Sequence, residues 1–315
     1  MHGLHSIGVK IMKIFWFIFL VSFSVFGASN DYQIICRKGS NHIYEKFAEI
    51  GPDDFSGPCP LMADRISFGN GNIQTYLQIN PDGVPFAYGI TFPETILEGL
   101  PSKDVPSDFQ NCFDADENGI ISEKECIGGH SRFLFYPKNK LKTEIRWSTF
   151  NYSPIGRLPP GVYDLPLFEF RFHLRDFFEV NSIKLGPCPG LINCEDYALA
   201  AKELPEKYIP KGYANLNMIE GKVGNLLMDT YGPEFDPKKK FRNSFIWGAF
   251  NGKISFFEVM VSLERLKEKK SGCYPIRQAE SYEKLAYYPT KYCIKYWENK
   301  KQFFVSLEGF VRKRK

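Results

Sequence analysis

Short stretches of alternating apolar and polar residues, separated by turn sequences, constrain this fold most. Residues 168–174 (FEFRFHL) alternate strictly, so a strand here has phenylalanines on one face and Glu169, Arg171 and His173 on the other. Other strands are predicted over 73–79, 86–92, 244–250, 253–261, 292–297 and 302–307, with turn residues between neighbouring strands. The pattern therefore predicts antiparallel hairpins.

Helical patterns are few and short. Only residues 194–206 and 262–269 have the spacing expected of helices, and no internal repeat or linker separates the chain into parts. The chain has 315 residues, 43% of them hydrophobic, which is enough for a sizeable core and unlike a disordered or coiled-coil protein. We predict a single β-rich α+β domain over 29–315, made of antiparallel sheets and hairpins with a few short helices.

The amino-terminal segment resembles a secretory signal. Residues 14–28 (IFWFIFLVSFSVFGA) form an uncharged apolar run after Lys13 and end in small residues. The run is shorter than the roughly 20 residues that span a bilayer, although an uncleaved anchor is the alternative. We expect 1–28 to be a signal peptide, the protein to be secreted or periplasmic, and no stable membrane span to remain after cleavage.

Eight cysteines follow this segment, and export would make them disulfide partners. Oxidising compartments favour disulfides over zinc or reactive thiols, and the chain contains no CxxC pair. Pairing of nearest neighbours closes short local loops, so we predict four bridges: Cys36–Cys59, Cys112–Cys126, Cys188–Cys194 and Cys273–Cys293.

Residues 114–125 (DADENGIISEKE) match an EF-hand calcium loop. The match places oxygen ligands at positions 1, 3, 5, 7, 9 and 12, and glycine (Gly119) at position 6, where the chain turns sharply. The loop has five acidic side chains and one lysine. The predicted Ca²⁺ ligands are Asp114, Asp116, Asn118, the carbonyl of Ile120, Ser122 and Glu125.

An acidic surface turn is the alternative interpretation of this segment. Pro106 limits a helix before the loop and Gly128 ends one after it, whereas a complete EF-hand has a helix on each side. Only one such loop is present, which favours a structural site over a sensor. Cys112 and Cys126 bracket the loop and would replace the missing helices as its constraint.

Several blocks resemble a family of functionally uncharacterised secreted bacterial proteins. These blocks lie at 69–101, 156–174 (GRLPPGVYDLPLFEFRFHL), 208–213 and 241–260. In that family the second block resembles GHxPPGVYDVPHFDFHFY, with histidines that suit a transition metal, and a later block resembles MGxHW. The resemblance implies a fold and export but no reaction.

This chain departs from the family pattern at its histidines. Arg157, Leu167 and Arg171 occupy histidine positions, and Leu226 corresponds to the later one, whereas His130, Glu169 and Glu258 remain at matching places. The resemblance therefore implies that the metal site is absent. Arg157, Glu169, Arg171 and Glu258 form either an ion-paired cluster or an anion pocket where the metal would be.

Three functions remain open from the sequence. The first is a non-catalytic calcium-binding protein, the second an enzyme or small-ligand binder that uses the degenerate site, and the third an oligomeric cell-surface interaction protein. The formal net charge is only +4, so we expect no binding to nucleic acid. Serine-hydrolase, zinc-protease and P-loop motifs are absent from the sequence.

Overall fold

The computed structural model describes residues 58, 60–106, 111–137, 141–236 and 238–313. The predicted signal peptide at 1–28 and the predicted Cys36–Cys59 bridge lie outside these residues. The prediction of a β-rich α+β fold is confirmed, because fifteen strands and three short α-helices account for the regular structure of the described part.

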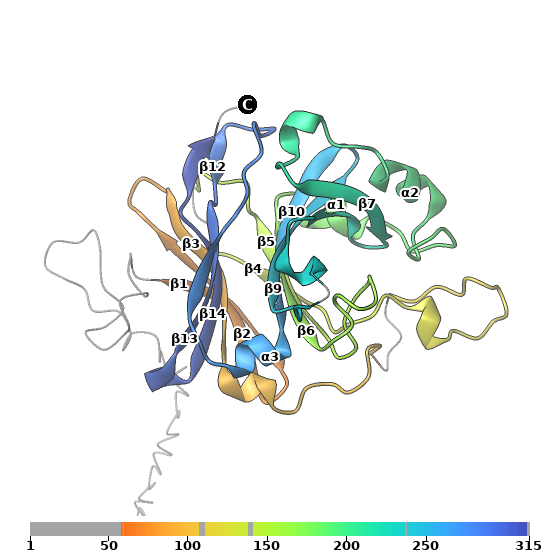
Figure 1. The fold of residues 1–315 in the computed structure, drawn as a ribbon, viewed down its shortest axis with the longest axis horizontal. Coiled ribbons are helices and arrows are strands. Elements are labelled where there is room, and N and C mark those ends of the chain that lie inside the picture. Colours follow the sequence, from red (N-terminus) through yellow and green to blue (C-terminus); the bar gives the residue numbers. More distant parts are fainter. Residues whose placement is uncertain (1–57, 59, 107–110, 138–140, 237, 314–315) are drawn as a thin grey trace, which may run out of the picture.

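Two large antiparallel sheets lie face to face (Figure 1). The first has the order β1 (Leu61–Phe68), β2 (Gly71–Ile79), β3 (Pro85–Pro93), β14 (Gln302–Glu308), β13 (Lys291–Trp297) and β11 (Gly272–Pro275). The second has the order β4 (Arg132–Phe135), β5 (Trp147–Ser153), β6 (Leu167–His173), β10 (Lys253–Ser262), β9 (Asn243–Phe250), β8 (Gly224–Asp229) and β7 (Tyr213–Glu220). A small sheet pairs β12 (Ala286–Tyr288) with β15 (Val311–Lys313).

The main hydrophobic core lies between the two large sheets. Phe92 of β3 stacks on Phe170 of β6 at 5.8 Å between ring centroids, and Phe303 of β14 stacks on Phe92 at 5.3 Å. Because side chains alternate along a strand, the phenylalanines of β6 face this core while Glu169 and Arg171 face the opposite side. The second sheet therefore has an outer face that carries charged groups.

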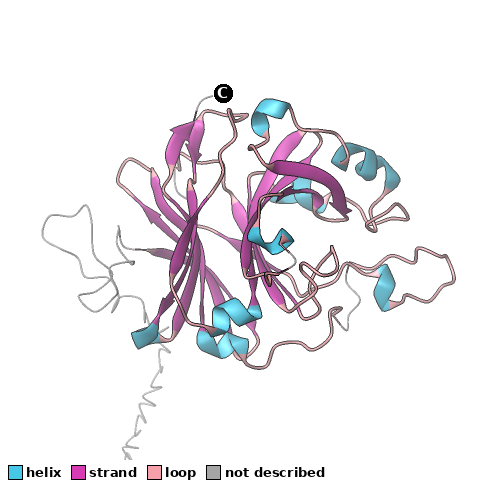
Figure 2. Cartoon of the chain, viewed as in Figure 1, coloured by secondary structure: helices cyan, strands magenta, loops and turns pink. Residues whose placement is uncertain are grey.

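The helices are at the periphery, at the ends and outer side of the two layers (Figure 2). They are α1 (Phe177–Asn181), α2 (Cys194–Ala200) and α3 (Leu263–Lys267). Short 3₁₀ turns are η2 (Glu94–Leu97), η3 (Glu123–Glu125), η4 (Glu206–Tyr208), η5 (Pro233–Phe235) and η6 (Glu298–Lys300).

Both predicted helices are shorter than expected. The helix predicted at 194–206 ends at Ala200, because the Leu199 carbonyl accepts a hydrogen bond from the Asn251 amide at 2.9 Å instead of continuing the helix. Pro205 also disfavours helical backbone at the residue before it. The helix predicted at 262–269 begins after Ser262, whose hydroxyl caps it by accepting from the Arg265 amide at 3.2 Å.

All the predicted strands are present, with ends that differ by at most two residues. Eight strands of the described part were not predicted: β1, β4, β5, β7, β8, β11, β12 and β15. In β5 all seven residues are buried, and polar residues lie on both faces: Ser148 bonds Tyr136 on the core side, whereas Asn151 bonds Glu169 on the outer side. Three of the predicted disulfides are also confirmed: Cys112–Cys126, Cys188–Cys194 and Cys273–Cys293.

Candidate functional site

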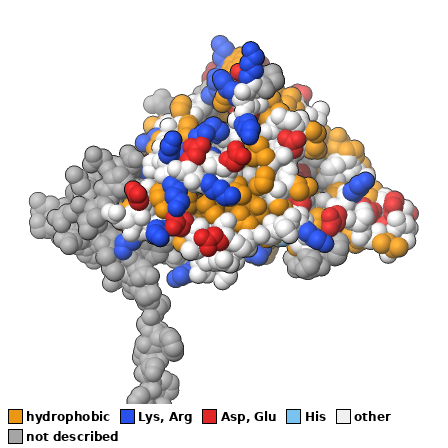
Figure 3. All heavy atoms as spheres, turned by 60° about the horizontal axis from the view of Figure 1, so that its bottom comes forward, with side chains coloured by type: hydrophobic (Ala, Val, Ile, Leu, Met, Phe, Trp, Pro, Cys, Tyr) orange, Lys and Arg blue, Asp and Glu red, His pale blue; other side chains and the backbone are white. Residues whose placement is uncertain are grey.

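The acidic loop at 114–125 projects from the body of the molecule, at the right of Figure 1. The Cys112–Cys126 disulfide joins its two ends, and the same two residues form an isolated β-bridge. On either side, the Phe113 amide donates to the Glu125 carbonyl at 2.8 Å and the Ile127 amide donates to the Asn111 carbonyl at 3.0 Å. Figure 3 shows acidic side chains at this projecting end. Covalent and backbone bonds therefore close the loop in place of flanking helices.

The first half of the loop folds around the carboxylate of Asp114. The Gly119 amide donates to its Oδ2 at 2.8 Å and the Asn118 amide donates to its Oδ1 at 3.2 Å. Gly119 has φ of +79°, a backbone conformation that a side chain would strain. The glycine at the sixth position of the pattern is therefore needed for the turn.

Glu125 closes the second half of the loop. Its Oε1 accepts from the Ala115 amide at 2.8 Å, and its Oε2 accepts from the Ser122 amide at 2.8 Å and the Ser122 hydroxyl at 2.9 Å. The hydrogen bonds from Ser122 and Ala115 lower the pKa of Glu125 below its ordinary value, so this carboxyl is ionised at neutral pH.

Three carboxylates of the loop converge. One oxygen from each of Asp114, Asp116 and Glu125 lies within 4.8 Å of the others. The Asn118 side-chain oxygen, also a predicted ligand, accepts from the Ile120 amide at 2.7 Å. The predicted ligands thus lie in one compact turn, and its carboxylate oxygens are hard ligands of the type that calcium prefers.

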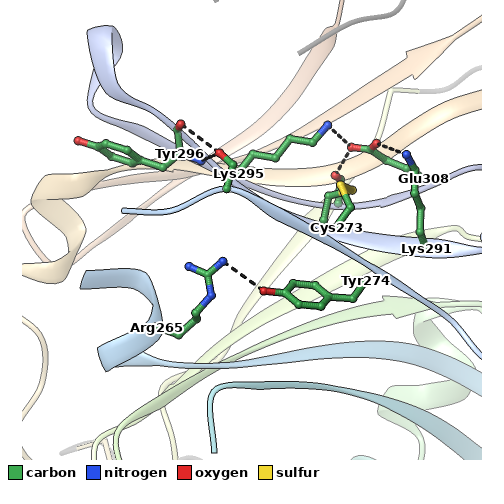
Figure 4. Close-up of a disulfide and its surroundings, with 10 residues drawn as sticks. Arg265, Cys273, Tyr274, Lys291, Lys295, Tyr296 and Glu308 are labelled. Atoms are coloured by element: carbon green, nitrogen blue, oxygen red, sulfur yellow. Dashed lines mark hydrogen bonds and ion pairs between the residues drawn. A yellow bond between two sulfur atoms is a disulfide. The ribbon is translucent and has the colours of Figure 1, made fainter. Parts of the chain in front are cut away.

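A second group of metal-ligating residue types, Cys273, Cys293 and Glu308, does not form a candidate metal site. The two cysteines are bonded to each other, and Glu308 pairs with Lys295 at 2.8 Å and with Lys291 at 3.7 Å (Figure 4). Because a disulfide sulfur is a poor metal ligand and the carboxylate is already neutralised, this group is structural.

The charged residues singled out in the sequence meet on the outer face of the second sheet. Arg171 of β6 lies beside Glu258 of β10 in the strand register and donates through Nε to Glu258 Oε2. Arg171 Nη2 also donates to Glu169 at 3.0 Å, and Arg157 Nη2 donates to Glu169 at 2.8 Å. Asn151 adds a further donor to Glu169. The structure therefore brings Arg157, Glu169, Arg171 and Glu258 into one ion-paired cluster.

The two carboxyls of this cluster differ in their protonation. Burial alone would raise the pKa of Glu169, but Arg157 and Arg171 together lower it to about 2. Burial raises the pKa of Glu258 to about 7, because Arg171 compensates only part of the lost hydration. Glu258 is 0% exposed, and its Oε1 has no hydrogen-bond partner in the described part of the chain.

Two cavities lie next to the cluster. The larger, about 630 Å³, is lined by Arg157, Glu169 and Glu258 and by many apolar residues. The smaller, about 440 Å³, is more polar and is lined by Arg171, His130 and His173 among others. Arg157 and Glu220 line both, as do Ile127 and Gly128, which follow the acidic loop in the chain.

The positions where the family resemblance implies histidines lie in two environments. Arg157 and Arg171 belong to the charged cluster, whereas Leu167 is buried in an apolar cluster with Met260. Leu226 packs against that same apolar cluster and lines the larger cavity.

His173 is not part of the charged cluster. Its Nε2 lies 2.9 Å from the Thr149 hydroxyl, and its ring stacks on Trp147 at 3.6 Å. Burial lowers the pKa of His173 well below its ordinary value, so the ring is neutral.

Glu220 was missed from the sequence. It lies at the end of β7, a strand without clear alternation, and burial raises the pKa of its half-buried carboxyl even though Arg157 acts in the opposite direction. A lone glutamate carries no motif, so only the pairing of β7 with β8 indicates that it lies beside the cluster.

Within the described residues, no helix is long and apolar enough to cross a membrane. Comparison of the chain with family models, with curated proteins and with solved structures finds no match. The resemblance to secreted bacterial proteins stays a prediction.

Proposed function

We propose that this protein is an exported calcium-binding protein and that the loop at 114–125 holds the ion. The observation that carries the proposal is the convergence of the Asp114, Asp116 and Glu125 carboxylates inside a loop with EF-hand spacing. Three carboxylates this close repel one another, and a divalent cation removes that repulsion. The role is structural: the ion would order a projecting loop that has little core of its own.

The bonded ends of the loop support this interpretation. An EF-hand ordinarily relies on two helices to hold its loop, whereas here one 3₁₀ turn, η3, follows within the loop itself. The Cys112–Cys126 disulfide and its neighbouring backbone hydrogen bonds supply the constraint. Disulfides are typical of exported proteins, which agrees with the predicted secreted or periplasmic location.

The expected affinity is that of an extracellular module, with a dissociation constant of about 10⁻⁴–10⁻³ M. At about 10 mM calcium such a site stabilises the folded state by roughly 1.4–2.7 kcal/mol. For a domain of this size we expect a rise in melting temperature of about 3–11 °C.

The test is a thermal unfolding series with and without calcium, with magnesium as a comparison. We expect calcium to raise the melting temperature of the wild-type protein and Glu125→Gln to abolish the rise. Glu123→Gln is the matched control, because it removes the same charge from the same loop at a position that EF-hand spacing does not use. An absent calcium shift in the wild-type protein, or equal loss in both variants, would refute the proposed site.

A further inference from the structure

We propose that the larger cavity on the outer face of the second sheet binds a small apolar molecule that carries a protonated amine. This proposal does not rest on the proposed calcium binding. The cavity has a volume of about 630 Å³, within the range of about 300–1,000 Å³ that is usual for sites of small ligands.

The walls of the cavity are apolar. Strands β6 to β10 contribute side chains, and helix α2 and three loops, within 126–128, 155–164 and 189–191, contribute the rest. The main apolar residues are Leu158, Leu191, Leu226, Met228, Ile246 and Met260. Leu158 is 63% exposed although it lines the cavity. An exposed apolar side chain beside an apolar hollow gains by covering a bound apolar group.

The charged groups of the cavity are mostly acidic. Asp164, Glu169, Glu220 and Glu258 line it, against one basic side chain, Arg157. Arg157 already donates to Glu169. Arg171, the other arginine of the cluster, lines the smaller cavity instead. A bound cation therefore meets an excess of negative charge.

Glu258 supplies the specific contact. Its side chain is fully buried and lines this cavity, and Oε2 is taken by Arg171 on the β6 side. On the other side its neighbour in the register is Ile246 of β9, which also lines the cavity. Its Oε1 is buried and has no hydrogen-bond partner among the described residues, and the proposal assigns the ammonium group to this oxygen. A buried carboxylate oxygen without a donor is costly, and an ammonium group would satisfy it.

Glu220 offers a second acceptor. It lines the cavity from β7, and no cation among the described residues forms an ion pair with it within 4.0 Å. Two carboxylates that line one cavity suit an ammonium group, which has three donors and no acceptor. A carboxylate ligand would instead be repelled, and an alcohol would gain a hydrogen bond without the ionic attraction.

The test is isothermal titration calorimetry of the full protein with three probes that share one apolar body. It is carried out at a pH of about 8, where Glu258 is mainly ionised. The probes are phenylbutylamine, phenylbutanol and phenylbutyrate. We expect the amine to bind about tenfold tighter than the alcohol and the acid to bind more weakly still. Equal affinities for amine and acid, or no binding of the amine, would overturn the proposal.

Two variants of the cavity and one control locate the binding. Glu258→Gln removes the charge of the proposed contact and is expected to weaken amine binding by about tenfold or more. Leu226→Trp fills the apolar part of the cavity and should abolish amine binding. This variant keeps the test possible if Glu258→Gln does not fold. Glu308→Gln is the matched control, because Glu308 is a buried, ion-paired glutamate in the other sheet and should leave amine binding within about twofold. Unchanged amine affinity in the folded cavity variants would refute this location.

Discussion

Replacement of Arg171 by methionine tests how strongly the ion-paired cluster supports the second sheet. Arg171 is 6% exposed, and the carboxylates that it contacts, Glu169 and Glu258, are 2% and 0% exposed. Without Arg171, Glu258 loses the only ion pair that it makes among the described residues, whereas Glu169 keeps Arg157. Loss of one partner from a buried pair costs about 3–5 kcal/mol, because a charge remains buried without compensation.

This loss of free energy predicts a measurable fall in melting temperature. A domain of this size changes its melting temperature by about 2–4 °C for each kcal/mol, so Arg171→Met should lower it by about 6–20 °C. Urea and thermal unfolding at a pH of about 8, where Glu258 is mainly ionised, measure the loss. The double variant Arg171→Met, Glu258→Met should lose much less than the sum of the two single variants, since no unpaired charge remains at that position.

Arg242→Met is the matched control for this experiment. Arg242 makes two hydrogen bonds of 2.5 Å to Glu268, but its side chain is 56% exposed. Exposed pairs contribute about 0–1 kcal/mol. If Arg171→Met lowers the free energy of unfolding no more than Arg242→Met does, burial of the cluster does not strengthen its ion pairs, and the reasoning is refuted.

Two further predictions concern protonation and the disulfide of the acidic loop. The pKa of Glu258 is about 7 in the folded state against 4.5 ordinarily, so the folded protein binds more protons than the unfolded chain between these pH values. Stability should therefore fall as pH rises from 4.5 to 7. Urea unfolding midpoints measured against pH should show this fall, and Glu258→Gln should flatten it. Glu169, with its pKa lowered to about 2, acts in the opposite sense below 4.5, where stability should be lost as pH falls. The double variant Cys112→Ser, Cys126→Ser should weaken calcium binding about tenfold while the sheets stay folded. Calcium titration measures the affinity, and circular dichroism measures the folding of the sheets. An unchanged affinity would show that the disulfide does not constrain the site.

The sequence predicts the strands with clear alternation well, and it places side chains on the correct face of β6. Phe168 and Phe170 lie in the core, whereas Glu169 and Arg171 lie outside, because a strand offers only these two faces. The spacing of one loop likewise predicts which residues of 114–125 lie close together. Local patterns succeed where neighbours in sequence are neighbours in space.

Local sequence patterns do not predict the larger cavity. Glu258 and Ile246 face each other because β10 pairs with β9, but Glu220 reaches the same place from β7, two strands further away. The order in which seven strands pair brings these residues together, and a single sequence does not give the register between distant strands. Helix α2 is shorter than predicted for a related reason, since hydrogen bonds to Asn251 and Asn225 take carbonyl groups at its end.

The outer face of the second sheet is covered by loops, and covalent bonds hold two of them in place. The Cys188–Cys194 bridge closes a short loop that places Leu191 in the cavity wall, and Gly190 in this loop, with φ of +83°, packs against the backbone of Ile219. The Cys112–Cys126 bridge closes the acidic loop, and Cys126 itself lines the cavity. Loops have little apolar area to bury and open easily, so a disulfide restrains them where packing against a second sheet cannot. Since one of these two bridges ends at the residue next to Glu125, the conformation of the acidic loop and the shape of the cavity wall depend on the same short segment of chain.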